Sequence, residues 1–168
     1  DSKNTVIRTA AMDCYILPCE YMGFDTTSIA SSDTFAALQT GVVEGLAGST
    51  PAGAYLNYRD IIDYYYVYQM SPEVTQIMIS EKTLAKLSPE DQKTIVDICR
   101  QECANSVNYA KEEDEKYLKL MEDNGIKIVR FTDEEIEMFA EAVRTNVWPQ
   151  LAKTYGEDFI NELLKLYK

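Results

Sequence analysis

Apolar and polar positions alternate along this chain with two periods, one typical of strands and one typical of helices. Short runs rich in β-branched or aromatic residues predict strands at residues 5–11, 26–30, 64–68, 74–80 and 126–131. Apolar residues at helical spacing predict helices at residues 12–22, 31–41, 51–58, 81–87, 88–124, 132–155 and 157–167. The interleaving of strands and helices favours an α/β fold.

Start and stop signals support several of the helix boundaries. Ser31 and Ser32 are expected to cap the helix that follows, because their hydroxyls can accept from the unpaired N–H groups of its first turn. Thr132 begins a capping box. Pro149 is expected to kink the helix that Thr132 starts, and Gly156 is expected to end it.

One predicted helix is much longer than the others. Ser88 and Pro89 are a strong start signal, and Asn124 with Gly125 is an end signal. The helix between them has about 35 residues, more than a helix of an ordinary globular domain. Such a helix is expected to run between two lobes rather than within one small lobe.

Composition and charge narrow the classes of function. With 46% hydrophobic residues the chain can bury a core, and its net charge of −12 argues against binding to nucleic acid or anionic membranes. No apolar run approaches the ~20 residues of a membrane span, and the polar start predicts no export signal within this chain. The first 80 residues carry three basic side chains, those of Lys3, Arg8 and Arg59. An anion that binds to this half of the chain therefore has few cationic side chains available as partners.

Histidine and cysteine usage restricts the chemistry further. The chain has no histidine, so Ser-His and Cys-His dyads and histidine metal sites are excluded. Its four cysteines have neither the CxxC spacing of metal and redox motifs nor a spacing suited to a disulfide within one helix. They are expected to be buried structural thiols: Cys14, Cys19, Cys99 and Cys103. No metal and no cofactor is predicted.

Four sequence segments, taken in order, resemble a known family. They are IRTA (7–10), Gly23, SDTFAALQTGVVEG (32–45) and SEKTLAKLSPEDQKTIV (80–96). In this order and spacing they are similar to the solute-binding receptors of TRAP transporters, the dicarboxylate-receptor (DctP) type. The resemblance implies a two-lobed, periplasmic-binding-protein-like (type II) receptor. Such a receptor lies outside the cytoplasm, periplasmic or tethered to the cell membrane, and captures a small organic acid for a membrane permease.

The family's members are longer than this chain, and nothing here matches their N-terminal lobe. The resemblance therefore implies that the N-terminal lobe is absent and that the chain is a fragment. Residues 1–87 are expected to form the second, ligand-binding α/β lobe, and residues 88–124 the long spanning helix. Residues 125–168 are expected to supply a strand and C-terminal helices that pack on the lobes.

The resemblance also implies a ligand contact at Arg8. In the family an arginine at the corresponding position binds the substrate carboxylate through two salt-bridged hydrogen bonds. Arginine suits this role because its planar fork matches a carboxylate, which lysine cannot reproduce. The alternatives for Arg8 are a solvated arginine at a strand end and a structural ion pair.

The segment Gly48-Ser49-Thr50 is a second candidate contact. Gly48 falls where many family members have an asparagine that helps to hold the carboxylate, and Ser31 falls where some have a pocket aromatic. The glycine could let a ligand reach backbone N–H groups, with the Ser49 and Thr50 hydroxyls as donors. Alternatively these residues only form a turn before the helix that Pro51 starts.

A tyrosine run and one arginine complete the candidates. Tyr66, within Tyr64-Tyr65-Tyr66-Val67-Tyr68, is taken as a pocket residue, although alternation in a strand turns about half of such a run elsewhere. Arg59 is expected to form a surface ion pair with Asp60.

Three functions remain open from the sequence. The leading one is the solute-binding subunit of a TRAP-type transporter, without catalysis. The second is a receptor-like sensing or interaction domain without a transport role, and the third is an enzyme that uses a cluster of acids. Partners are expected to be a small organic acid and permease subunits. Self-association of the chain is also expected, through apolar surface on the long helix.

Overall fold

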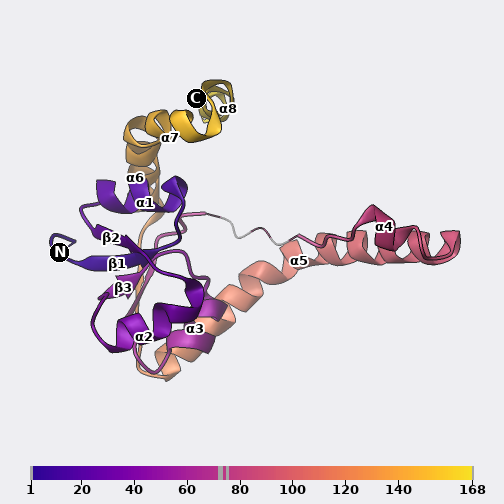
Figure 1. Ribbon diagram of the computed structural model, residues 1–168. Coiled ribbons are helices and arrows are strands. Elements are labelled where there is room, and N and C mark those ends of the chain that lie inside the picture. Colours follow the sequence, from indigo (N-terminus) through magenta and orange to yellow (C-terminus); the bar gives the residue numbers. More distant parts are fainter. Residues whose placement is uncertain (1, 72–73, 75, 168) are drawn as a thin grey trace.

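The N-terminal part of the chain forms an α/β lobe around a three-stranded parallel sheet. The computed structural model describes residues 2–71, 74 and 76–167 (Figure 1). The strands are β1 (Val6–Thr9), β2 (Asp25–Ser28) and β3 (Gly45–Leu46), in the order β2-β1-β3. In this register Arg8 pairs with Thr27 on one side and with Leu46 on the other. Because all three strands are parallel, their carboxyl ends meet at one edge of the sheet.

Helices cover both faces of this sheet. The chain passes from β1 to β2 through α1 (Asp13–Tyr21), and from β2 to β3 through η1 (Ser31–Asp33) and α2 (Thr34–Gln39). These two crossovers run in opposite directions across the sheet, so their right-handed connections place α1 and α2 on opposite faces, as Figure 1 shows. The helix α3 (Pro51–Tyr58) follows β3. The order of strands thus reverses at β1.

A second sheet and the long helix share one core. The strand β4 (Tyr64–Val67) pairs in parallel with β5 (Lys127–Arg130), and α5 (Pro89–Asp123) is 35 residues long. The C-terminal end of α5 packs between α3 and this sheet. The buried residues of this shared core are Ala54, Leu118, Met121 and Ile126. This core holds one end of the long helix on the lobe.

The last three helices pack against α1. They are α6 (Asp133–Asn146), α7 (Trp148–Tyr155) and α8 (Glu157–Lys165). Val147, Leu151 and Ile160 form their buried cluster, and Leu17 of α1 packs against it. The predicted break occurs between α6 and α7, with proline in the first turn of α7, and Gly156 separates α7 from α8.

The other end of α5 projects away from the lobe. Together with α4 (Glu81–Leu84) and the preceding chain it forms an extended arm, defined here as residues 76–110 (Figure 1). Met78 is 82% exposed and Ile98 is 54% exposed on this arm. The prediction of an unusually long helix at residues 88–124 is confirmed, and its N-terminal part lies beyond the lobe (Figure 1).

The predicted helix starts are confirmed at Ser88 and Thr132 and wrong at Ser31 and Ser32. The hydroxyls of Ser80, Ser88 and Thr132 each accept a backbone N–H of the first turn. Ser31 and Ser32 do not cap α2, because residues 31–33 form a 3₁₀ turn and α2 starts only at Thr34. The Ser32 hydroxyl donates instead to the Asp33 carboxylate at 3.1 Å.

The strand predicted at residues 74–80 is wrong for the residues that can be assessed. Residues 74 and 76–80 form no strand, and residue 75 lies outside the described part of the chain. A strand needs a neighbour to pair its backbone groups. The apolar side chains of this segment are exposed, with Val74 at 77% and Ile77 at 62%. Conversely, the two-residue strand β3 was not predicted, because Gly45-Leu46 is too short for a pattern.

The expectation of four buried thiols is also wrong. Cys19 is buried, whereas Cys14 and Cys103 are exposed and Cys99 is half-buried, and all four are free. Burial raises the pKa of Cys19 to about 11, so that thiol stays protonated. Cys14 lies in the first turn of α1, next to Tyr155 of α7, and the other two lie on the arm. A helical spacing of cysteines therefore did not predict burial.

Candidate functional site

Arg8 lies in the central strand, close to the carboxyl edge of the sheet. It is half-buried, and its Nε donates to the carbonyl oxygen of Ile29, just beyond β2, at 2.9 Å. Within the described part of the chain Arg8 takes part in no ion pair. Ligands of open parallel sheets bind outside the carboxyl ends of the strands, where the strand order reverses. The guanidinium group of Arg8 lies at such a position.

The loop Gly48-Ser49-Thr50 lies at the same edge. It follows β3, and the N–H of Ala47 donates to the carbonyl oxygen of Arg8 at 2.9 Å. Gly48 has φ +82°, a conformation that glycine adopts without strain. The Thr50 hydroxyl caps α3 by accepting the N–H of Gly53 at 3.1 Å. The predicted turn before Pro51 is therefore present, and ligand contact by these residues stays a prediction.

A tyrosine next to the predicted one holds this loop in place. The Tyr65 hydroxyl donates to the Ser49 carbonyl oxygen at 2.9 Å. Burial, reinforced by the nearby Asp114 carboxylate, raises the pKa of Tyr65 to about 12, so the phenol stays a donor. Sequence reasoning did not select Tyr65. The signal was present in the strand alternation, because Tyr65 and Val67 share the face that packs on the core.

Tyr66 lies on the opposite face of β4. Its ring stacks between those of Tyr64 and Tyr68, with centroids 6.1 Å from each, and it is 49% exposed. Successive side chains of a strand point to opposite faces, so Tyr66 points away from the side on which Tyr65 reaches Ser49. The structure therefore does not bring Tyr66 together with the loop of residues 48–50.

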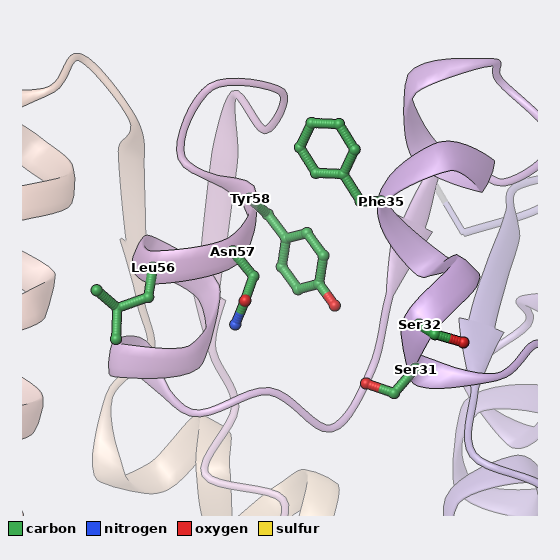
Figure 2. Close-up of a pocket in the computed structure, with 6 residues that line it drawn as sticks. All are labelled: Ser31, Ser32, Phe35, Leu56, Asn57 and Tyr58. Carbon is green, nitrogen blue, oxygen red and sulfur yellow. The ribbon is translucent and has the colours of Figure 1, made fainter.

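Ser31 lies on the wall of an open cavity between α2 and α3. The cavity has a volume of about 510 Å³ and is lined by Ser31, Ser32, Phe35, Leu56, Asn57 and Tyr58. Figure 2 shows Tyr58 of α3 extending toward Ser31 of η1 and Phe35 of α2, whereas Leu56 and Ser32 point away from the opening. Of the predicted site residues, the lining includes Ser31. The lining includes neither Arg8 nor residues 48–50, so the structure does not bring Ser31 together with them in this cavity.

The Arg59 guanidinium is engaged by its own helix. Its Nη1 donates to the carbonyl oxygens of Tyr55 and Leu56, each at 3.3 Å, and its Nε lies 3.9 Å from Asp60. The predicted surface pair with Asp60 is confirmed. A free anion would thus meet Arg8 at the sheet edge rather than Arg59.

The described residues offer neither a metal site nor a membrane-spanning helix. They hold no group of three or more His, Cys, Asp or Glu side chains that could bind a metal. Within the same residues, no helix combines the length and apolar character needed to cross a membrane. The candidate site is thus an arginine with no carboxylate partner among the described residues, at the carboxyl edge of a parallel sheet that also carries the loop of residues 48–50.

The comparison with family models identifies the family. The chain belongs to the bacterial extracellular solute-binding protein family 7 (DctP), whose model matches residues 1–154. This confirms the resemblance to the receptors of TRAP transporters. No match was found among the curated proteins.

Solved structures of TRAP periplasmic solute-binding proteins share the fold. One from Escherichia fergusonii, in an open form without ligand, has a TM-score of 0.76 at 20% identity over 95% of this chain and 53% of its own. One from Sulfitobacter sp. NAS-14.1 with bound β-D-galacturonate has a TM-score of 0.74 at 22% identity over 96% and 53%. One from Shewanella oneidensis with bound succinate has a TM-score of 0.74 at 18% identity over 96% and 53%. This chain thus spans about half the length of these proteins.

Tyr65→Phe should loosen the loop without disturbing the core. It removes one hydrogen bond, and we expect a loss of about 0.5–1.5 kcal/mol in the free energy of unfolding, measured in urea. It should also change the stability profile at high pH. The pKa of Tyr65 is about 12 in the folded chain and ordinarily 10.0, so wild-type stability should fall as pH rises from 10 to 12.

The phenylalanine variant should lack that share of the alkaline loss, because it has no proton to release. Tyr66→Phe is the matched control, since it makes the same chemical change one residue along the strand on an exposed ring. An equal alkaline loss in wild type and Tyr65→Phe would contradict the role given to this hydrogen bond.

Proposed function

We propose that this chain is the ligand-binding lobe of a TRAP-type receptor that captures a small organic acid through Arg8. The receptor acts outside the cytoplasm, delivers the acid to membrane permease subunits and catalyses no reaction. The observation that carries the proposal is the Arg8 guanidinium, which lacks a carboxylate partner among the described residues at the edge where parallel sheets bind ligands. The family match supports it, because the family's members are solute-binding proteins.

The domain roles follow from the same proposal. Residues 1–87 carry the ligand site, residues 88–124 connect this lobe to a second one, and residues 125–168 brace the lobe through α1. A second lobe would close over Arg8, exclude water from the ion pair and so strengthen it. The match to only half of each solved structure is consistent with this division.

A ligand titration of residues 1–168 tests the proposal. Succinate and D-galacturonate should shift the NMR signals of the Arg8 side chain and of residues 48–50. Binding should be weak, with a dissociation constant near or above 1 mM, because an exposed ion pair contributes only about 0–1 kcal/mol. Two results would count against it: no shift at Arg8 with either acid, or micromolar binding by this half-site alone.

The arm should make the chain self-associate. It carries exposed apolar side chains, among them Ile77, Met78 and Ile98, and exposed apolar surface favours association. Light scattering should therefore give a mass above 19.1 kDa that rises with concentration. Replacing Ile77, Met78 and Ile98 with serine should restore the monomer mass. A clean monomer in the wild type would show that this surface does not associate.

A further inference from the structure

The cavity between α2 and α3 contains a tyrosine that is buried and yet has no hydrogen-bond partner. Tyr58 is 8% exposed, and its hydroxyl makes no hydrogen bond with another residue in the described part of the chain. A buried tyrosine hydroxyl usually finds a partner, as that of Tyr65 does at the Ser49 carbonyl oxygen. Figure 2 shows the Tyr58 side chain extending into the opening toward Ser31. The hydroxyl is therefore available to a molecule that enters the cavity.

The protein holds Tyr58 in place through its backbone and ring. Tyr58 is the last residue of α3, and its carbonyl oxygen accepts the N–H groups of Ile61 at 2.9 Å and Ile62 at 3.2 Å. Among the described residues, the side-chain oxygen that is sealed from solvent without a partner is that of Thr9, not that of Tyr58. The Tyr58 ring is thus buried, while its hydroxyl remains accessible from the opening.

The other side chains around the cavity are polar or apolar but uncharged. The Asn57 amide nitrogen donates to the Gly53 carbonyl oxygen at 2.8 Å, which leaves the amide oxygen as an acceptor. Ser31 adds a hydroxyl, and Phe35 adds a ring that is 39% exposed. None of the six side chains that line the cavity carries a charge. The lining therefore combines neutral hydrogen-bonding groups with aromatic surface.

Charged residues that neighbour the lining in sequence are engaged elsewhere. The Asp33 carboxylate accepts from the Ser32 hydroxyl at 3.1 Å, and Ser32 points away from the opening. The Arg59 guanidinium donates to carbonyl oxygens of its own helix and lies beside Asp60. An organic acid in the cavity would lose hydration without gaining a cation as a partner. The cavity therefore suits a neutral molecule better than a carboxylate.

We propose that this cavity is a second binding site, separate from Arg8, for a neutral ring compound that carries several hydroxyl groups, such as a monosaccharide. Its volume of about 510 Å³ lies within the range of small-molecule pockets. Hydroxyls of the ligand pair with Tyr58, Ser31 and Asn57, and the C–H face of its ring packs on Phe35. This inference goes beyond the proposed function, which concerns an acid held by Arg8, and does not depend on it.

NMR titration of residues 1–168 with D-galactose and D-galacturonate tests this site. The two sugars have the same ring and differ in one group, which is a neutral CH₂OH in galactose and a carboxylate in galacturonate. D-Galactose should shift the signals of Ser31, Phe35 and Tyr58 but not those of the Arg8 side chain, with a dissociation constant in the millimolar range. D-Galacturonate should bind in the cavity about threefold more weakly or less, because no cation there compensates its charge.

Tyr58→Phe removes the hydroxyl that has no partner in the protein. It should weaken D-galactose binding about three- to tenfold, and the melting temperature should not fall, because no hydrogen bond within the protein is lost. Tyr55→Phe is the matched control, since it makes the same chemical change on the same helix outside the lining of the cavity. Ser31→Leu is a second variant that places an apolar side chain in the opening and should also weaken binding. Ser31 caps no helix, so this change should leave the fold intact.

Three results would overturn the inference. They are no shift of the lining signals in wild type at tens of millimolar D-galactose, a shift of the Arg8 signals in their place, and equal D-galactose affinity in wild type and Tyr58→Phe. A parallel titration with succinate separates this inference from the proposed function. A succinate shift at Arg8 without a galactose shift in the cavity would refute the second site alone, and the reverse would refute the proposed function alone.

Discussion

Arg8→Ala should lower the affinity of the proposed two-lobed receptor for the proposed organic acid by about a hundredfold or more. In a closed cleft the ligand carboxylate would be left out of water without its partner. Breaking a buried ion pair in this way costs on the order of 3–5 kcal/mol. Isothermal titration calorimetry on the wild-type and variant receptors, with the acid that the wild type binds, measures the loss directly.

The stability of the unliganded protein should respond differently. Arg8 forms no ion pair with the described residues, so its removal costs the single hydrogen bond to Ile29, and the melting temperature should change little. Arg59→Ala is the matched control, since it removes an arginine that serves its own helix. A lower melting temperature for Arg8→Ala with ligand affinity intact would assign Arg8 a structural role instead.

Leu118→Ala should have the largest effect on folding among the changes considered. Leu118 is 2% exposed and lies in the core that joins α5 to α3 and to the β4-β5 sheet. Deleting a buried leucine side chain removes its transfer free energy and leaves a cavity, at a cost of about 2–5 kcal/mol. Urea unfolding should show this loss as a lower midpoint with an unchanged slope.

Ile98→Ala provides the contrast on the same helix. Ile98 is 54% exposed on the arm, and surface substitutions usually stay within about 0.5 kcal/mol. Comparable losses for Leu118→Ala and Ile98→Ala would mean that the arm is packed as firmly as the core. Of the two ends of α5, we expect only the C-terminal end to contribute substantially to the free energy of unfolding.

Local signals in the sequence predicted the helices well. Ser88 with Pro89 and the capping box at Thr132 depend on side chains reaching N–H groups one turn away, so neighbouring residues decide them. Gly156 ends α7 for a similarly local reason, its positive φ. Features set by a few adjacent residues can be predicted without knowing the fold.

Features that depend on distant partners were not predictable in this way. The apolar run at residues 74–80 has the composition of a strand, but strand formation needs a second strand to pair with. Burial of the cysteines depends on what packs against each helix, and Cys103 faces solvent because the arm extends away from the lobe. The secondary-structure propensities of residues predict neither the pairing of a strand nor the burial of a cysteine.

The sequence indicated only part of the candidate site, because other contacts in it also depend on segments that are distant in the sequence. Arg8 was found through a sequence motif, and its place at the sheet edge agrees with the predicted role. The contact of Tyr65 with the loop was not predicted, because it arises only when β4 packs beside Ser49. Tyr66 itself does not reach the loop, because the side chains of neighbouring residues in a strand point to opposite faces.

The affinity of the Arg8→Lys receptor for its organic acid is the measurement that tests the central claim most directly. Lysine keeps the positive charge but loses the planar fork that pairs with both carboxylate oxygens. The account predicts that calorimetry will show affinity lowered about tenfold or more, with the melting temperature of the unliganded protein unchanged. An affinity within about twofold of wild type would contradict it and would remove Arg8 from the binding site.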